Sequence, residues 1–344
     1  MKIYNFKKSI RFLRIFLPAY TGLFFRPAPI WAHLFVTRRC NLNCKYCYVR
    51  DNNKLELDEE NMKKIIDKLY ILGVRLISFF GGEPTIRKDF VDLLKYANNK
   101  GMITHFSTNG ILLTSEHIER IGEAGIDVIN LSVDSVFEFN DSTKDYIRSK
   151  KVLEDLITAR KKFGFEINIS LVLTRKNMDL VVKTVKLFDK YKIPIAVGLI
   201  SQNTYSNQPL DKSLFFNSKK DKIKLYKLLE DLKELKKEGY NLIDPYDYFD
   251  GIKNHLENYT EWSCHAGKYF ISVDCDGKFQ ICAGLKAEDI SIFDIDKNKL
   301  KAMEKLRQLK FNWCKKMCFS NCAYDTSYFI NHPFYFIGEL FKRK

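Results

Sequence analysis

Three cysteines stand within eight residues near the start of the chain: Cys40, Cys44 and Cys47. Thiolates of this kind bind zinc ions or iron–sulfur clusters. A structural zinc ion normally takes four protein ligands, and neither a fourth cysteine nor a histidine lies close by; His33 is expected as a strand residue that faces the other way. Three thiolates instead suit a 4Fe–4S cluster, in which one iron atom stays open for a small molecule.

The other six cysteines form a second group near the end of the chain. They are Cys264, Cys275, Cys282, Cys314, Cys318 and Cys322. Their close spacings are typical of metal ligands rather than of a disulfide framework, which favours a reducing, cytoplasmic compartment. Zinc and an iron–sulfur cluster both remain open for this group.

Alternating strand-like and helical segments must position the first group. The strand-like segments are 33–36, 76–80, 103–107, 128–133, 166–173 and 195–199. The helical segments between them are 59–72, 90–99, 115–124, 150–163 and 178–191. Six such units with short connections predict an α/β fold with a parallel sheet and outer helices, either open or curled into a partial barrel. Active sites in these folds lie at the carboxyl ends of the strands, and the cysteine trio follows the first strand.

The later part of the chain has a different pattern. A polar stretch at 203–217 precedes a helix at 219–237, and this region is the expected domain boundary. Two short strands, 269–273 and 278–281, flank a turn at 274–277 and predict a hairpin among the late cysteines.

Both chain ends combine basic and apolar residues. Segment 3–17 has the periodicity of an amphipathic helix, and 328–341 is rich in aromatic residues before a basic end. The net charge is +15, and no acidic residue precedes Asp51. Such ends suit either the surface of an anionic membrane or packing against the barrel. We expect no transmembrane helix and no export signal, so the protein is expected in the cytoplasm, with a peripheral site on the inner face of the membrane as an option.

The spacing Cys-x3-Cys-x2-Cys, with Tyr46 before its last cysteine, resembles the defining motif of the radical S-adenosylmethionine (SAM) superfamily. The resemblance covers about residues 32–200. It implies that the cluster on the three cysteines binds SAM through its open iron. An electron from an external donor then splits SAM into methionine and a 5′-deoxyadenosyl radical, which takes a hydrogen atom or adds to an alkene.

Further stretches extend the resemblance and imply contacts with SAM. The family's GGEP motif corresponds to Gly81, Gly82, Glu83 and Pro84, where glycine would let the backbone approach the ligand and Glu83 would accept from the SAM ammonium. Its S-x-N-G motif corresponds to Ser107 and Asn109, and its ribose and carboxylate contacts correspond to Ser132, Asp134 and Arg148. Ordinary polarity at strand ends and helix surfaces is the alternative for these last three residues.

The spacing of Cys264, Gly277 and Cys282 resembles the opening of SPASM and twitch domains, which carry auxiliary iron–sulfur clusters. This chain departs from the full SPASM pattern because only three cysteines follow, at different spacing. One auxiliary 4Fe–4S cluster is therefore expected, and a second stays open. The expected ligands are Cys264, Cys282, Cys318 and Cys322, with Cys314 close behind, and Cys275 is expected outside the set. Structural zinc is the alternative.

The sequence thus predicts five parts of the chain. They are a basic amphipathic segment (1–30), a partial (β/α)6 barrel of the radical SAM type (31–205), a helical linker (206–260), a small α+β SPASM/twitch-like domain (261–327) and an apolar, basic tail (328–344). The chain ends, with a short C-terminal similarity to an enzyme that adenosylates a hopanoid, favour a membrane lipid or isoprenoid as the substrate. The alternatives are maturation of a ribosomally made peptide and a non-catalytic zinc protein that binds nucleic acid, although no nucleic-acid partner is expected.

Overall fold

The structure is a computed structural model that describes residues 28–136, 144–201, 210–258, 262–332 and 335. Six strands alternate with helices in its first part. The strands are β1 (Trp31–Thr37), β2 (Leu76–Gly81), β3 (Ile103–Thr108), β4 (Val128–Ser132), β5 (Glu166–Leu173) and β6 (Ile195–Leu199). The helices are α2 (Glu59–Leu72), α3 (Phe90–Asn99), α4 (Ser115–Glu123), α5 (Tyr146–Phe163) and α6 (Met178–Asp189).

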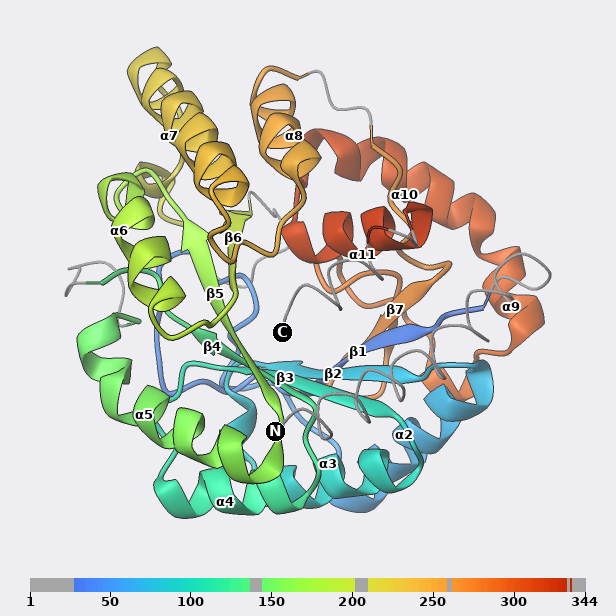
Figure 1. Cartoon of the computed structure of the whole chain (residues 1–344). Coiled ribbons are helices and arrows are strands. Elements are labelled where there is room, and N and C mark those ends of the chain that lie inside the picture. The colour runs from blue at the N-terminus through green and yellow to red at the C-terminus, as the bar shows by residue number, and fades with distance from the viewer. Residues whose placement is uncertain (1–27, 137–143, 202–209, 259–261, 333–334, 336–344) are drawn as a thin grey trace.

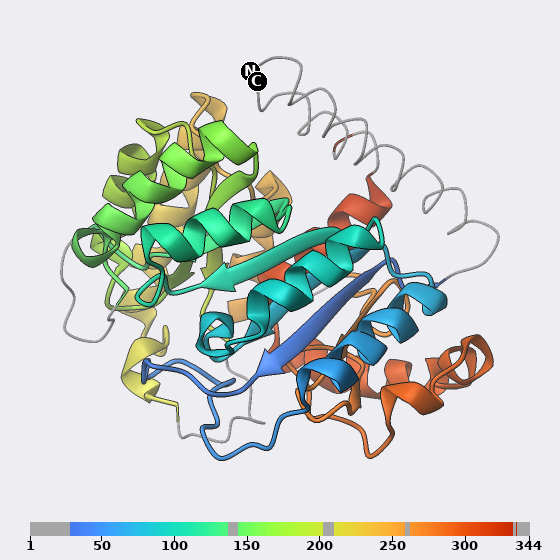
Figure 2. The ribbon, with the colours of Figure 1, turned by 90° about the horizontal axis from the view of Figure 1, so that it is seen from below.

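The six strands lie side by side in chain order, and all their pairings are parallel. Figure 1 shows helices α2 to α6 on the outside of this curved sheet. In Figure 2, helices α2, α3 and α4 lie across the outer face of the sheet. The sheet does not close on itself, because β6 stays at one edge. The expected partial (β/α)6 barrel is therefore confirmed, and each strand bound lies within two residues of the predicted one.

Helix α2 illustrates how local sequence sets these elements. Asp58 caps its first turn by accepting from the Asn61 N–H, and Gly73 ends it with a left-handed backbone. The apolar stripe of α2 is buried, so the helix stabilises the sheet by packing. Helix α5 begins earlier than the predicted residue 150, because Tyr146 packs on Phe188 of α6 and anchors the first turn.

The C-terminal part adds two strands and several helices. Strands β7 (Phe270–Val273) and β8 (Phe279–Gln280) form the predicted hairpin. The helices are α7 (Lys219–Lys237), α8 (Tyr246–Leu256), α9 (Lys297–Ala302), α10 (Glu304–Met317) and α11 (Asn321–Asn331). The hairpin is not a sheet of its own, since β7 pairs in parallel with β1 and extends the barrel sheet to eight strands. Helix α11 also continues past residue 327, where the tail was expected to begin.

Some expectations lie outside the described residues. These are the amphipathic helix at 3–17 and almost all of the tail after residue 332. In the part of the chain that the structure describes, no helix is long and apolar enough to cross a membrane.

The inner face of the sheet carries polar side chains. His33, Ser78 and His105 stand in register on β1, β2 and β3 and therefore point to the same side. Ser78 Oγ accepts from Trp31 Nε1 at 2.8 Å and lies 2.7 Å from His105 Nδ1. Farther along, Asn168 Nδ2 donates to Asn130 Oδ1 at 3.1 Å. The barrel interior thus carries hydrogen-bonding groups beside aromatic rings such as Phe35 and Phe80.

Candidate active site

The loop after β1, residues 38–57 (the cluster loop), holds the first cysteine trio at the carboxyl edge of the sheet. Cys44 is buried, and Cys40 and Cys47 are partly exposed. The Cys47 N–H donates to the Cys44 carbonyl at 3.0 Å, and the Leu42 N–H points at Cys40 Sγ at 3.4 Å. A short turn therefore joins Cys44 to Cys47, while Cys40 lies nearer the start of the cluster loop.

A buried lysine accompanies the trio. Burial lowers the pKa of Lys144, but the neighbouring Cys44, Asp134, Cys47 and Cys40 more than offset this, so that its pKa lies above the usual range. Its ammonium also lies 5.3 Å from the centre of the Tyr46 ring. Lys144 carries no motif signal, and sequence reasoning missed it. It places a positive charge beside three potential thiolates.

Gly81 and Gly82 fit the end of β2 against the cluster loop. The Gly82 N–H donates to the Thr37 carbonyl at 3.0 Å. A Cβ at Gly82 would lie 2.1 Å from the Arg39 oxygen, and one at Gly81 would lie 2.4 Å from the Thr37 oxygen. The close approach that requires glycine here is to the cluster loop itself, whereas the sequence suggested an approach to the ligand.

Glu83 follows these glycines and is 1% exposed. Its carboxylate accepts from Thr85 Oγ1 at 2.7 Å, Thr108 Oγ1 at 2.8 Å and the Asn109 N–H at 2.8 Å. Burial raises its pKa, and these donors oppose the rise. Glu83 thus joins the short helix that begins at Pro84 to the end of β3, and its contact with a SAM ammonium stays a prediction.

Asn109 and Asp134 each connect the barrel to the cluster loop. Asn109 Nδ2 donates to Asn41 Oδ1 at 2.9 Å and lies 4.0 Å from Cys40 Sγ. Asp134 Oδ2 accepts a short hydrogen bond from the Tyr46 hydroxyl, and its Oδ1 accepts from the Val172 N–H at 3.0 Å. Both Asp134 oxygens therefore have protein partners. In this arrangement Asp134 anchors Tyr46, and its predicted contact with a ribose is untested.

The remaining residues of the predicted SAM site are less connected. Ser107 and Ser132 lie in β3 and β4, in register with Asn130 and Ser170 respectively. Arg148 lies in the first turn of α5, and its side chain is outside the described part of the structure. The roles of all three in binding SAM stay predictions.

The late cysteines gather around one cavity of about 140 Å³ (the auxiliary cavity). Its walls include Cys282, Cys314, Cys318 and Cys322. Cys264 lies beside them: burial raises the pKa of its thiol, and Cys282, Cys318 and Cys314 add to the rise. The structure therefore brings together all five cysteines of the expected ligand set.

The donor chemistry of this group fits a cluster. Burial raises the pKa of both Cys282 and Cys314 to about 12, with Cys318 adding to each, so these thiols need a cation to become thiolates. Five sulfurs also exceed the four that a cubane needs. Among the described residues, no three His, Cys, Asp or Glu side chains are grouped so that they could hold a metal ion.

Tyr48 lies between the two cysteine groups, and sequence reasoning missed it although it directly follows Cys47. Its side chain forms part of the wall of the auxiliary cavity. Burial raises the pKa of its hydroxyl above the usual range, and Cys282, Cys322, Cys318 and Cys47 add to the rise. Tyr48 is thus near thiols of both groups.

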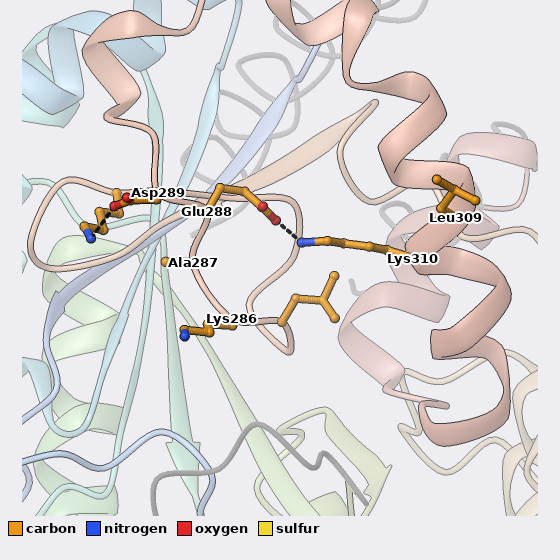
Figure 3. Close-up of a pocket in the computed structure, with 8 residues that line it drawn as sticks. Lys286, Ala287, Glu288, Asp289, Leu309 and Lys310 are labelled. Atoms are coloured by element: carbon orange, nitrogen blue, oxygen red, sulfur yellow. Dashed lines mark hydrogen bonds and ion pairs between the residues drawn. The ribbon is translucent and has the colours of Figure 1, made fainter.

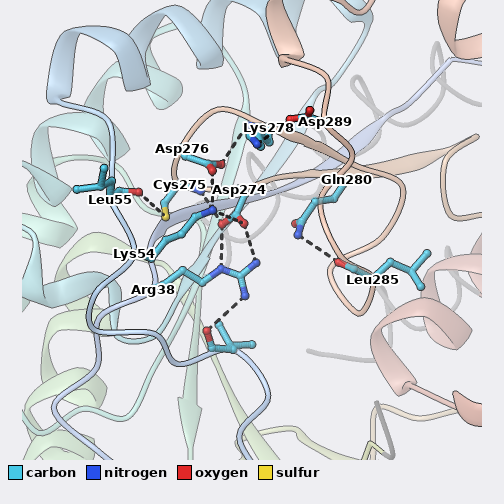
Figure 4. A network of polar contacts seen from close by, with 11 residues as sticks. Arg38, Lys54, Leu55, Asp274, Cys275, Asp276, Lys278, Gln280, Leu285 and Asp289 are labelled. Atoms are coloured by element: carbon cyan, nitrogen blue, oxygen red, sulfur yellow. Dashed lines mark hydrogen bonds and ion pairs between the residues drawn. The ribbon is translucent and has the colours of Figure 1, made fainter. Parts of the chain in front are cut away.

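Cys275 has a different environment from the other late cysteines, as expected from its place in the turn. It is fully buried, and its thiol points at the Leu55 carbonyl at 3.5 Å (Figure 4). The Leu57 N–H donates to the Cys275 carbonyl at 2.9 Å. Cys275 therefore packs against the cluster loop.

An ion pair reinforces this contact. Arg38, at the start of the cluster loop, donates to both carboxylate oxygens of Asp274 at 2.9 and 3.1 Å, and Lys54 pairs with Asp276 at 2.5 Å (Figure 4). The exposed fractions of the Arg38 and Asp274 side chains are 11% and 6%. The β7–β8 turn, in the C-terminal part of the chain, thus holds the cluster loop in place through these two ion pairs (the clamp).

Asp274→Asn is expected to lower the free energy of unfolding by about 3–5 kcal/mol, because it leaves Arg38 as an uncompensated buried charge. Burial alone would raise the pKa of Asp274, but Arg38 and the Cys275 N–H hold it below its usual range. The contribution of the Arg38–Asp274 pair to the free energy of unfolding is therefore present above about pH 4 and is lost as the pH falls further. Anaerobic urea denaturation at several pH values measures it.

Asp289→Asn is the matched control on the same hairpin. Its pair with Lys278 is exposed, at 95% for Asp289 and 44% for Lys278, so no measurable change is expected. Equal stability of Asp274→Asn and the parent protein would contradict the clamp.

A wider hollow of about 640 Å³ lies next to the auxiliary cavity, and Leu285 forms part of the wall of both (Figure 3). Its walls are Lys278, Leu285, Lys286, Ala287, Glu288, Asp289, Leu309 and Lys310. Lys310 pairs with Glu288, and Lys278 pairs with Asp289. Because none of the wall residues is a cysteine and these charges are paired, the auxiliary cavity is the better candidate site.

Comparison with known proteins identifies the first part of the chain. Residues 34–188 match the family model described as Radical SAM superfamily. The Fe-coproporphyrin III synthase of Methanosarcina barkeri is 32% identical over 173 residues, which are 49% of this chain and 42% of that protein. The PqqA peptide cyclase of Bradyrhizobium diazoefficiens is 30% identical over 154 residues, 44% of this chain and 40% of the cyclase.

The mycofactocin maturase MftC of Mycolicibacterium smegmatis is 33% identical over 162 residues, 44% of this chain and 40% of the maturase. The matches therefore span about two fifths of the length of these curated relatives.

Two solved structures share the fold. Native anSMEcpe with bound AdoMet has a TM-score of 0.61 and 18% identity, over 92% of this chain and 99% of the other. Streptococcus suis SuiB bound to the precursor peptide SuiA has a TM-score of 0.61 and 19% identity, over 78% of this chain and 64% of SuiB.

An unclosed parallel sheet with three cysteines in the loop after its first strand agrees with this match, and residues 34–188 are a radical SAM domain. The family uses a 4Fe–4S cluster and SAM, in agreement with the cofactors expected from the sequence.

Proposed function

We propose that this protein is a radical SAM enzyme that holds a 4Fe–4S cluster on Cys40, Cys44 and Cys47 and modifies a peptide. The observation that carries the proposal is the cluster loop at the carboxyl edge of the sheet, where all three thiols lie near Lys144 and where Gly82 and Asn109 contact the loop. When bound, the cluster and SAM supply a 5′-deoxyadenosyl radical.

The chain's own residues then position the cofactors and exclude water. Asn109 and Tyr46 fix the cluster loop through Asn41 and Asp134. Lys144 balances the negative charge of the thiolates. The late cysteines hold one auxiliary 4Fe–4S cluster, and Tyr48 occupies the space between the two groups.

The polar interior of the barrel favours a peptide over the lipid that the chain ends first suggested. Asn130 and Ser132 of β4 are in register with Asn168 and Ser170 of β5, and all four are partly exposed. A hydrocarbon chain would leave such groups unpaired, whereas the amides of a peptide offer both donors and acceptors. Among the relatives named above, PqqA peptide cyclase and SuiB with its bound peptide also support this substrate class.

The lipid hypothesis rested on the two chain ends, which lie almost wholly outside the described residues. All nine cysteines are free, which supports the proposal of a reducing, cytoplasmic location. An external electron donor is part of the proposal.

The test uses protein purified and reconstituted without oxygen, with SAM, dithionite and the short peptides encoded beside the gene. We expect about eight iron atoms per chain, formation of 5′-deoxyadenosine, and a change in the mass of one peptide that requires SAM. Colourless protein with bound zinc would overturn the whole proposal. Cleavage of SAM with modification of a lipid would overturn the peptide substrate alone.

Cys282→Ala separates the two clusters. We expect this variant to lose about four iron atoms and its peptide modification, while the cluster on the first trio and slow cleavage of SAM remain. The measurements are iron and sulfide per chain and the rate of 5′-deoxyadenosine formation. Full retention of iron in this variant would show that the auxiliary cluster does not depend on Cys282.

A further inference from the structure

His33 lies against the late cysteines, although sequence reasoning gave it no ligand-binding role. It is 1% exposed, and its Nε2 lies 3.4 Å from Cys322 Sγ. The same side chain forms part of the wall of the auxiliary cavity, together with Cys282, Cys314 and Cys318. A buried imidazole thus meets the proposed cluster site from the barrel side.

The fold fixes this imidazole firmly. His33 is in the middle of β1, paired with Ser78 of β2 on one side and Ser272 of β7 on the other. Its ring is enclosed by Phe80, at 4.9 Å between centroids, and by Trp31 at 5.5 Å. Packing against Trp31, Phe80 and Phe270 leaves the ring little freedom, so the contact with Cys322 is set by the sheet.

Cys322 meets the ring from the first turn of α11, which begins at Asn321. The positive end of a helix dipole favours a thiolate at that position. Burial raises the pKa of the free Cys322 thiol, so its sulfur becomes a charged acceptor when it binds a cluster.

The proton of the neutral imidazole is best placed on Nε2. The other nitrogen, Nδ1, has no hydrogen-bond partner among the described residues, so a proton there would be a buried donor without an acceptor. A thiolate has no proton of its own and can only accept. The arrangement that satisfies both groups is an N–H on Nε2 directed at Cys322 Sγ.

We propose that His33 donates an N–H···S hydrogen bond to Cys322 within the auxiliary cluster and raises the reduction potential of that cluster. This proposal rests on the proposed function, because it requires a cluster bound to Cys322. A hydrogen bond to a ligand sulfur stabilises the more negative, reduced form, and such bonds are one of the levers that set cluster potentials. Five thiols already exceed the four ligands that a cubane needs, so His33 acts as a positioning residue and not as an iron ligand.

The test uses the full chain with Cys40, Cys44 and Cys47 all changed to alanine, so that only the auxiliary cluster remains. His33→Leu is made in this background, and the midpoint potential is measured by redox titration with electron paramagnetic resonance. We expect unchanged iron, about four atoms per chain, and a midpoint shifted to a more negative potential. His33→Gln, which keeps an N–H donor, is expected to recover part of the shift.

His105→Leu is the matched control, because His105 is also a buried histidine of the barrel interior but bonds to Ser78 and not to a cysteine. It is expected to leave the midpoint unchanged. A midpoint in His33→Leu equal to that of the parent would overturn the proposal. Loss of the cluster in both His33 variants would also overturn it, in favour of iron ligation or a purely structural role.

Absence of any cluster in the triple-alanine parent would refute the auxiliary cluster and this proposal together. Cleavage of SAM at the first trio is tested separately, so the two failures are distinguishable.

Discussion

Cys44→Ala is expected to abolish formation of 5′-deoxyadenosine while leaving about half of the iron, roughly four atoms per chain. Cys44 is buried and a short turn joins it to Cys47, and its loss removes one of only three ligands. A cluster held by two thiolates has no stable position on this loop. The measurements are 5′-deoxyadenosine by liquid chromatography and iron per chain after anaerobic reconstitution.

Cys275→Ala is the matched control for this experiment. Cys275 is also a buried thiol, but it contacts the Leu55 carbonyl, and the charges that act most on its raised pKa are those of Asp274 and Arg38. We expect full iron content and an unchanged rate of SAM cleavage. Continued cleavage of SAM by Cys44→Ala would refute the assignment of the first trio.

Gly82→Ala is expected to have the second largest effect, a loss of SAM cleavage of at least about 100-fold, as follows from a displacement of about 1 Å in an active site. The new Cβ would lie 2.1 Å from the Arg39 carbonyl oxygen, and its other two nearest atoms also belong to the backbone of Arg38 and Arg39. Backbone cannot rotate away as a side chain does, so the cluster loop must shift. The rate of 5′-deoxyadenosine formation and the iron content measure the effect.

Gly101→Ala tests whether any glycine substitution would do the same. No heavy atom lies within 4 Å of a Cβ built at Gly101, so this variant carries only the strain of a left-handed backbone. We expect it to lose some stability and to keep its rate of cleavage. If Gly82→Ala cleaves SAM as fast as Gly101→Ala, the fit between β2 and the cluster loop does not govern the site.

The sequence was sufficient to predict the order and type of most elements. Strand β5 and helices α2, α3 and α7 have the predicted bounds because their apolar periodicity is strong and their ends carry turn or capping residues. The hairpin was predicted from its turn. Its pairing with β1 was not, because periodicity identifies a strand without naming its neighbour.

The candidate site divides in a similar way. The closely spaced cysteines and the glycines before Glu83 are recognisable in the sequence. The atom that Gly82 approaches is a backbone oxygen of Arg39, which no sequence motif indicates. Lys144 and His33 were missed because their significance comes only from residues distant in the chain. Asp134 was expected to contact the ribose of SAM. In the structure, both of its carboxylate oxygens accept hydrogen bonds from the protein.

The position of β7 beside β1 has a consequence for synthesis of the chain on the ribosome. Until residue 273 has emerged, β1 presents a bare edge of unpaired amides and carbonyls, and the cluster loop lacks its bond to Asp274. A nascent or truncated N-terminal half would therefore tend to self-associate and would hold its first metal centre poorly. Iron insertion at the first trio thus belongs after translation of the C-terminal third.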